Sequence, residues 1–478
     1  MKLKWIPVIL IALLISQTIL TCAFNLSGST HAQMTPDVYV GVDLAYGDVT
    51  EAKALIDQVG NYTNLIVVGT SKITWNPSAL NETFQYAFDR GLYFMGLTPS
   101  IPISTYNGSF ANRTEWFKYA NETWGDHLLG FYQDDEPGGK QIDVDDTQIV
   151  RSATSLADAS SQYESRINQT LTQTRVQRLN STGYPLYTSD YALYWFDYKG
   201  GYDGLFAEFG WNYTSQLTVA LCRGAANVQN KEWGVMITWT YRQPPYIESG
   251  TNLFNDMVLA YDNGAKYIII FDANEGWTAG ILQDEHLQAM QQFWQYIQNH
   301  PRKTVPLNQR TAYVLPKDYG YGFRGPIDKV WGLWPGDDFS YYLSLSISEL
   351  LREYGEKLDI IYDDGLEPGL NYGYSQLISW DSYNPTPTTT PTPTPSPAPT
   401  STPTATPTPT DPSTDPPTPT PSSSSSPTIE PTATQKQSGF LGTNLPLEYG
   451  YAIVATVVIV GVLAATAIAI RRRKKVQV

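Results

Sequence analysis

The amino-acid sequence predicts an α/β protein whose main part is a (β/α)8 barrel, and three observations indicate this fold. Short apolar runs rich in β-branched and aromatic residues alternate with longer helix-like segments over roughly 260 residues. Eight such runs occur, and each is largely continuous in its apolar character, as in a sheet that is buried on both faces. No glycine-rich phosphate loop follows the first run, where the sequence reads LAYGDVT, and this disfavours a doubly wound open sheet.

The expected elements follow one another in a regular order. Strands are expected at 38–45, 64–70, 92–99, 128–133, 185–192, 204–211, 233–241 and 265–273. Helices are expected at 49–59, 77–90, 115–124, 147–179, 215–228 and 284–299. The last helix carries an apolar face that should pack on the sheet, formed by Leu287, Met290, Phe293, Trp294 and Ile297.

Composition divides the chain into further parts. We expect a signal peptide at 1–33, the barrel at 34–305, a small α/β appendage at 306–383, a Pro/Thr/Ser-rich stalk at 384–440, a transmembrane helix at 450–470 and a basic tail at 471–478. The appendage reads strand, helix, strand, strand, and it resembles a fragment of a flavodoxin-like domain.

The two ends of the chain predict where the protein resides. Lys2 and Lys4 precede an apolar run, which is the pattern of a signal peptide. Five consecutive cations at 471–475 follow the second apolar run, and such a flank lies on the cytoplasmic side of a bilayer. We therefore expect a single-pass plasma-membrane protein whose folded part is extracellular. Sequons for N-glycosylation, which fit that compartment, begin at Asn61, Asn81, Asn107, Asn112, Asn121, Asn168, Asn180 and Asn212.

Charge and cysteine content narrow the classes of partner. The formal net charge is −15, and the cations gathered at the two ends leave the folded part more negative still. Nucleic acid is therefore not an expected partner. The two cysteines, Cys22 and Cys222, provide no disulfide framework, and a core of this size needs none.

The stretch LLGFYQDDEPG at 128–138 carries the strongest functional signal. An apolar strand stops at Asp134, Asp135 and Glu136, and Pro137 with Gly138 then provides turn chemistry. These acids fall at the carboxyl end of a strand, where barrel enzymes hold their active sites. The alternatives for the three acids are a solvated turn, or a Ca²⁺ site built from oxygen ligands.

Other acids and many aromatic residues are expected at the same rim. The further acids at strand ends are Asp43, Asp190, Glu208, Asp272 and Glu275. The aromatic residues are Tyr132, Tyr191, Tyr194, Trp195, Phe209, Trp211, Trp239, Tyr241 and Trp277. No histidine joins them, so a histidine metal site or a Ser-His-Asp triad is disfavoured, and we expect no cofactor. Paired carboxyls with flat aromatic faces suit the cleavage of glycosidic bonds in a carbohydrate substrate.

These residues give the chain a resemblance to the TIM-barrel glycoside hydrolases. In the largest clan of that superfamily, Asn-Glu-Pro at the end of the fourth strand carries the acid/base glutamate, and the matching triplet is Asp135, Glu136 and Pro137. The resemblance implies that Glu136 is the acid/base residue. It also implies that Trp277, after the eighth strand, forms the floor of the sugar site.

The sequence departs from the clan at the seventh strand. The clan places its nucleophilic glutamate there, whereas this chain has Thr238, Trp239 and Thr240. Glu208 is the first replacement, because other barrel hydrolases carry their acids on the fourth and sixth strands. Asp272 or Glu275 is the second choice. A third arrangement pairs Asp134 with Glu136, as in the substrate-assisted chitinase-like barrels.

Two classes of function remain open from the sequence. The first is a membrane-tethered glycosidase that acts on polysaccharide or surface glycan, with Glu136, Glu208 and Asp134 as candidate catalytic residues. The second is an inactive barrel on a stalk that binds glycan or builds a surface layer. The expected substrate contacts in either class are Asp43, Asp135, Tyr132, Tyr191, Trp211, Trp239, Tyr241, Asp272, Glu275 and Trp277.

Overall fold

The computed structural model describes residues 36–102, 112–143, 146–211, 213–364, 372–383 and 385. Within these residues, no helix combines the length and apolar character that a bilayer crossing requires. The expected signal peptide, stalk, transmembrane helix and basic tail lie outside the described residues, as do the sequons at Asn107 and Asn212.

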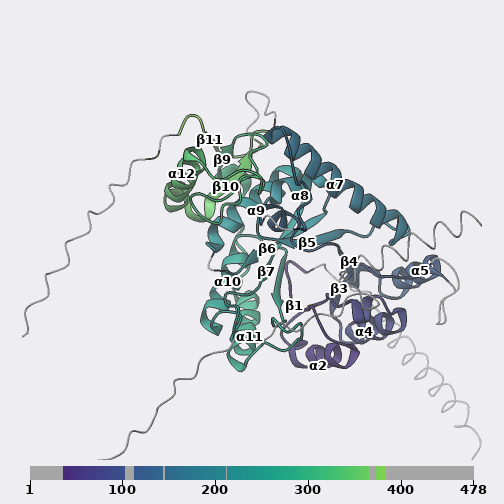
Figure 1. Ribbon diagram of the computed structural model, residues 1–478. Helices are drawn as coiled ribbons and strands as arrows, with labels where there is room; N and C mark the ends of the chain where they lie inside the picture. The colour runs from purple at the N-terminus through teal and green to yellow at the C-terminus, as the bar shows by residue number, and fades with distance from the viewer. Residues whose placement is uncertain are drawn as a thin grey trace, which may run out of the picture. The chain divides into compact units, whose positions relative to one another are not determined.

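Eight parallel strands of the described chain form a closed barrel, which confirms the expected (β/α)8 fold (Figure 1). They are β1 (Tyr39–Leu44), β2 (Leu65–Val68), β3 (Tyr93–Leu97), β4 (Leu128–Tyr132), β5 (Leu186–Asp190), β6 (Gly204–Phe209), β7 (Glu232–Ile237) and β8 (Tyr267–Phe271). Each strand pairs with its neighbours in sequence, and β1 also pairs with β8, with Tyr39 opposite Tyr267. Closure leaves no strand edge free.

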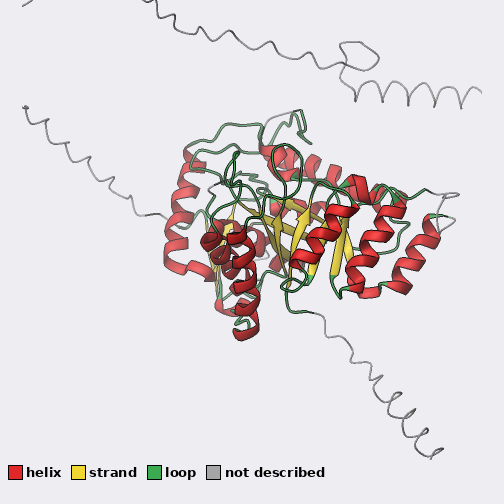
Figure 2. Ribbon diagram, turned by 90° about the horizontal axis from the view of Figure 1, so that it is seen from below, coloured by secondary structure: helices red, strands yellow, loops and turns green. Residues whose placement is uncertain are grey.

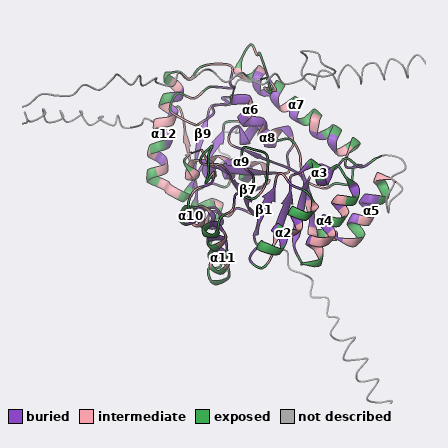
Figure 3. Ribbon diagram, turned by 60° about the horizontal axis from the view of Figure 1, so that its bottom comes forward, coloured by how far each residue is buried: buried purple, intermediate pink, exposed green. Residues whose placement is uncertain are grey.

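Helices surround the barrel, as Figure 2 shows. The longer ones are α2 (Val49–Val59), α4 (Pro77–Asp89), α5 (Arg113–Thr123), α7 (Leu156–Gln177), α8 (Tyr194–Gly200), α9 (Ser215–Gln229), α10 (Gly250–Asp262) and α11 (Asp284–Asn299). Short helices α3 (Ser71–Thr74) and α6 (Pro137–Ile142) follow β2 and β4, and 3-10 turns lie at Gly125–His127, Leu307–Gln309 and Gly355–Lys357. Their inner faces are buried against the strands and their outer faces are exposed (Figure 3).

Two sequence expectations about the helices were wrong. The helical stretch expected at 147–179 begins only at Leu156, because the Ser155 side chain caps the helix by accepting from the Asp158 amide at 3.1 Å. Helices α8 and α10 were not expected. Helix α8 holds Tyr194 and Trp195, which we expected at the rim; both are buried, and Trp195 packs on Tyr362 of the appendage.

The barrel interior has its own apolar core, distinct from the larger core between strands and helices. It contains Tyr39, Leu65, Val67, Tyr93, Met95, Tyr187, Phe206, Met236, Tyr267 and Ile269. These residues recur at every second position of their strands, because successive side chains of a strand point to opposite faces. The same alternation therefore decides which acids at the strand ends face into the barrel.

The appendage is a small three-stranded parallel sheet with one helix. It comprises β9 (Thr311–Leu315), α12 (Asp338–Tyr354), β10 (Leu358–Tyr362) and β11 (Gln376–Ser379), in the sheet order β10-β9-β11. The expected sequence of strand, helix, strand and strand is confirmed. Strand β10 lies against α9, where the Gly224 Cα is so close to the Ile360 carbonyl that a Cβ would lie 2.4 Å from its oxygen.

Candidate active site

The barrel mouth brings together carboxyl groups from three strands. Glu208 lies two residues after Phe206 of the inner core, so its side chain faces into the barrel, and Asp43 on β1 does the same. Asp135 and Glu136 follow β4 and complete the group. The four acids influence one another: after burial, Glu136 and Asp135 raise the pKa of Glu208, and Asp135 raises the pKa of Asp43.

The loop after β4 holds its acids in a strained backbone conformation. Asp134 and Glu136 both have positive φ, at 55° and 51°, in the left-handed region that non-glycine residues adopt at an energetic cost. The loop is fixed by the Glu136 amide, which donates to the Ser189 carbonyl at 3.1 Å. The strain is thus maintained by contacts with β5, and it sets the direction of the Glu136 side chain.

Asp190 anchors the next turn of this loop. Its buried carboxylate accepts from the Gly138 and Gly139 amides at 2.6 and 2.7 Å, and also from the amides of Tyr191 and Ala192. Burial raises the pKa of Asp190 to about 6, while these backbone hydrogen bonds act to lower it. A Cβ on Gly139 would lie 2.1 Å from the Tyr191 ring, so only glycine fits there. Asp190 therefore faces the loop rather than the opening of the barrel.

Glu136 and Glu208 are neighbouring carboxyls of the mouth. Burial, followed by the charge of Asp135, raises the pKa of Glu136 to about 8, and burial, followed by the charge of Glu136, raises the pKa of Glu208. The Glu136 side chain is 27% exposed, with the Lys140 Nζ 4.0 Å away. Glu208 is only 3% exposed. Buried carboxyls beside other acids cannot all ionise readily, so the pair retains a proton above the usual carboxyl range.

A chain of hydrogen bonds connects Glu208 with Asp135. The Ser189 hydroxyl donates to Glu208 Oε1 at 2.7 Å, and the Tyr132 hydroxyl donates to Asp135 Oδ1 at 2.7 Å. The two hydroxyl oxygens are themselves 2.7 Å apart. Asp135 is also held by Lys140, whose ammonium group donates to its carboxylate at 3.2 Å.

The hydrogen count of this chain has a chemical consequence. Three oxygen–oxygen contacts each need one hydrogen, but the two hydroxyls supply only two. The third must come from a protonated carboxyl of the mouth. The chain links two carboxyls that the sequence places 73 residues apart, and it is complete only while the mouth retains a proton.

Replacing Tyr132 by Phe is expected to remove one protonated carboxyl near neutral pH. Without the phenol, the Ser189 hydroxyl satisfies Glu208 and no third hydrogen is needed. The measurement is the infrared absorption of protonated carboxyl groups between pH 5 and 9, with Tyr341→Phe on the exposed face of α12 as the control. An unchanged carboxyl absorption in Tyr132→Phe would contradict the shared proton.

Asp43 is buried at the floor of the mouth without full hydrogen bonding. Its Oδ1 atom has no hydrogen-bond partner among the described residues, and Gly69 leaves just enough room for the carboxyl on the neighbouring strand. Burial and then Asp135 raise the pKa of Asp43 to about 8, against a weaker effect of the Gly69 amide. Asp43 is thus held as a neutral acid at pH 7.

The raised pKa of Asp43 predicts how stability depends on pH. The folded protein keeps this proton up to about pH 8, whereas the unfolded chain loses it near pH 3.8. The contribution of Asp43 to the free energy of unfolding is therefore greatest below pH 3.8, and it is lost as the pH rises to about 8. We expect Asp43→Asn to gain stability relative to the wild type between pH 5 and 9, measured by urea unfolding. A constant difference across this range would contradict the assignment.

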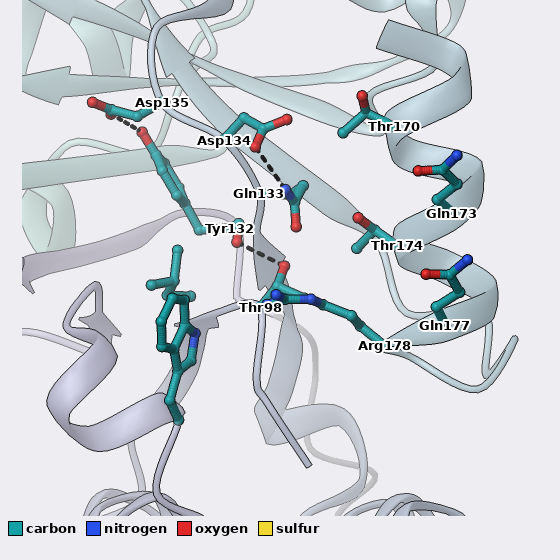
Figure 4. Close-up of a pocket in the computed structure, with 12 residues that line it drawn as sticks. Thr98, Tyr132, Gln133, Asp134, Asp135, Thr170, Gln173, Thr174, Gln177 and Arg178 are labelled. Atoms are coloured by element: carbon teal, nitrogen blue, oxygen red, sulfur yellow. Dashed lines mark hydrogen bonds between the residues drawn. The ribbon is translucent and has the colours of Figure 1, made fainter. Parts of the chain in front are cut away.

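The remaining predicted acids lie apart from the Glu136–Glu208 pair. Asp134 is exposed and accepts from the Gln133 amide at 2.7 Å, with its carboxylate directed towards α7 (Figure 4). Asp272 is buried and accepts from the amides of Gly280, Ile281 and Leu282, so it shapes the loop after β8. Glu275 is exposed on that loop. No group of His, Cys, Asp or Glu side chains in the described chain is arranged as metal ligands would be.

The aromatic residues predicted at the rim have different environments. The ring centres of Trp211 and Trp239 are 6.0 Å apart, and Trp239 donates to the Ala273 carbonyl. Trp277 is 62% exposed and its ring lies against Tyr46, while Tyr241 is also exposed. Tyr191 donates to Asp143 and lines the turn at Gly139. Phe209, expected at the rim, is buried in the outer core.

Three residues near the acids were not singled out from the sequence. Ser189 holds Glu208 and Lys140 holds Asp135. Burial, followed by the charge of Asp135, raises the pKa of Tyr46 to about 12. Ser189 could have been found, because it stands two residues after Tyr187 of the inner core and so faces into the barrel. No pattern in the sequence marks Tyr46 or Lys140.

Comparisons with known proteins concern the fold. No family model and no curated protein sequence matches this chain. Among solved structures, a GH5_18 protein from Streptomyces cattleya in complex with GlcNAc has 10% identity and a TM-score of 0.45, covering 72% of this chain and 99% of its own. An α-L-fucosidase isoenzyme 2 from Paenibacillus thiaminolyticus has 12% identity and a TM-score of 0.42, covering 71% and 59%. The endo-β-1,4-mannanase from Thermotoga petrophila has 7% identity and a TM-score of 0.35, covering 59% and 82%.

Proposed function

We propose that this protein is a glycoside hydrolase in which Glu136 and Glu208 act as the catalytic carboxyl pair. The observation that carries the proposal is that Ser189 of β5 holds both acids at the barrel mouth: the Glu136 amide donates to the Ser189 carbonyl at 3.1 Å, and the Ser189 hydroxyl donates to Glu208 Oε1 at 2.7 Å. Glycoside hydrolysis needs one protonated carboxyl for the leaving oxygen and one carboxylate for the anomeric carbon. Two carboxyls that share a proton supply both forms at once.

The environments of the two acids suggest how the roles divide. Glu136 is the more exposed and stands on the loop, so a leaving-group oxygen can reach it. Glu208 is buried, and the Ser189 hydroxyl on Oε1 leaves Oε2 free to face the sugar. Glu136 is therefore the general acid and Glu208 the nucleophile. A carboxylate that acts as nucleophile forms a covalent glycosyl-enzyme intermediate, so the anomeric configuration of the sugar is retained.

The setting of the pair supports a carbohydrate substrate. Trp211, Trp239 and Trp277 offer aromatic faces around the mouth for the apolar face of a sugar ring. The reaction needs no cofactor. The proposed plasma-membrane location rests on the apolar runs and basic tail of the sequence.

The experiment is hydrolysis of a panel of aryl glycosides and oligosaccharides by the purified full-length protein in detergent. We expect the first-formed product to have the same anomeric configuration as the substrate, as observed by proton NMR. A first-formed product of the opposite anomeric configuration would show that the protein is a hydrolase but would contradict the nucleophilic role of Glu208.

A second candidate function is a glycan-binding barrel without catalysis. The observation in its favour is that Thr238, rather than an acid, follows β7, where the resembling clan of hydrolases places its nucleophile. Retention of glycans on an array, with no hydrolysis of any member of the panel, would favour this second function.

A further inference from the structure

A groove of about 440 Å³ opens beside the candidate active site, between α3 and α7. Tyr132 and Asp135 belong both to its lining and to the hydrogen-bonded chain of the mouth, so the groove is continuous with the site (Figure 4). A substrate that extends past the Glu136–Glu208 pair on this side would therefore enter the groove.

Helix α7 presents a polar face to the groove. Thr170, Gln173, Thr174 and Gln177 follow the spacing of one helical face, which lies beside the buried face formed by Tyr163, Ile167, Leu171 and Thr174. The side chains of Gln173 and Gln177 are exposed, and within the described residues they make no hydrogen bond to protein. These two glutamines therefore offer amide groups to a polar ligand rather than packing on the strands.

The groove also contains an exposed tryptophan. Trp75 follows α3 and lines the groove with 53% of its surface exposed. An indole of this exposure has no structural role in the core, and its flat face suits the apolar face of a sugar ring. Together with the amides of α7, it has the composition of a carbohydrate subsite.

Arg178 adds a charge preference to this subsite. Its guanidinium is partly buried in the groove, 5.7 Å from the centre of the Trp75 ring. Among the described residues, no carboxylate forms an ion pair with this guanidinium and no acceptor hydrogen-bonds it. Asp134 and Asp135, the two acids that line the same groove, are not within ion-pair distance of it. Guanidinium groups bind a carboxylate through two parallel hydrogen bonds. A single carboxylate fits better than a polyanion, because the net charge of the chain is −15.

We propose that this groove binds a carboxylated sugar unit, a uronic acid, of an oligosaccharide whose neighbouring unit occupies the mouth. Trp75 stacks on the ring, Arg178 binds its carboxylate, and the glutamines of α7 bind hydroxyls. This proposal rests on the proposed function, because it places the neighbouring sugar unit in the barrel mouth. It adds to that function the class of substrate, an oligosaccharide that contains a uronic acid.

The test is binding of oligosaccharides that contain a uronic acid, measured by calorimetry on full-length Glu136→Gln protein so that no turnover occurs. The probes are matched oligosaccharides of two to four units, in carboxylated, carboxyl-reduced and sulfated forms. We expect the carboxylated form to bind at least about 10-fold more tightly than the reduced form. Arg178→Met should remove this preference, whereas Arg166→Met, on the exposed face of the same helix, should retain it.

Trp75→Ala should weaken both carboxylated and reduced forms by about 10-fold, because stacking does not depend on the carboxylate. Equal binding of the two forms, tighter binding of the sulfated form, or equal effects of Arg178→Met and Arg166→Met would overturn the proposal. Failure of the proposed hydrolysis is a separate outcome. An Arg178-dependent preference for the carboxylated form without turnover would support the groove proposal and reject the hydrolase. Hydrolysis of neutral substrates without that preference would support the hydrolase and reject the groove proposal.

Discussion

Replacing Glu136 by Gln is expected to lower kcat by about 10³-fold on glycosides with a poor leaving group, because such a group must receive a proton as the bond breaks. The loss should be much smaller for a dinitrophenyl glycoside, whose leaving group departs without protonation. Steady-state kinetics on the two substrates gives this comparison directly. A loss of equal size on both substrates would contradict the acid role of Glu136.

Glu208→Gln provides the complementary result. A nucleophile is needed whatever the leaving group, so both substrates should lose activity by about 10³-fold or more. Glu122→Gln, on the exposed surface of α5, makes the same chemical change away from the mouth and should leave both rates unchanged. If Glu208→Gln depends on the leaving group as Glu136→Gln does, the two roles are reversed.

The direction of each strand-end acid follows from sequence once one inner-core residue of the strand is known. Glu208 stands two residues after Phe206 and Asp43 four after Tyr39, so both face into the barrel. Asp272 directly follows Phe271, which packs on the inner core, and Asp190 is three residues after Tyr187, so both point out of it. Position at a strand end alone does not distinguish the four acids. The alternation of side chains along each strand does, because it indicates which acids face into the barrel.

The arrangement after β4 could not be derived in this way. The pairing of β3 with β4 shifts register between Phe94 and Met95, opposite Gly130, whose φ is 147°. This irregularity breaks the alternation along β4 before Tyr132 is reached. The left-handed residues Asp134 and Glu136 then turn neighbouring acids in different directions. Such a loop is set by tertiary contacts with Asp190 and Ser189, which no local pattern reveals.

The contacts of Arg223 show how the appendage packs on the barrel. This buried arginine of α9 binds Asp359 of β10 at 2.6 Å, and it also donates to Asn263 and to the Leu358 carbonyl. Helix α9 directly follows β6, the strand that carries Glu208. The small sheet therefore supports the part of the barrel on which one candidate catalytic residue stands.

Asp359 should contribute more to stability than Arg223 does. The Asp359 carboxylate accepts from several side chains, whereas Arg223 binds a single carboxylate among the described residues. Asp359 also accepts from Asn227 at 3.0 Å and from Tyr374 at 2.8 Å, and Arg310 lies 4.0 Å away. Loss of the carboxylate leaves two buried guanidinium groups without a counter-charge. Loss of Arg223 leaves Asp359 with its other donors and with Arg310.

We therefore expect Asp359→Asn to lower the free energy of unfolding by about 3–5 kcal/mol, and Arg223→Met by clearly less. Urea unfolding followed by tryptophan fluorescence measures both, with Asp363→Asn at the exposed end of β10 as the control. In the double variant the removal of both charges should recover part of the Asp359→Asn loss, since one uncompensated cation then remains instead of two. Equal decreases in the free energy of unfolding in the two single variants would show that Arg223 and Arg310 do not share the Asp359 carboxylate. A decrease in Asp359→Asn no greater than in Asp363→Asn would show that the small sheet contributes little to the stability of the barrel.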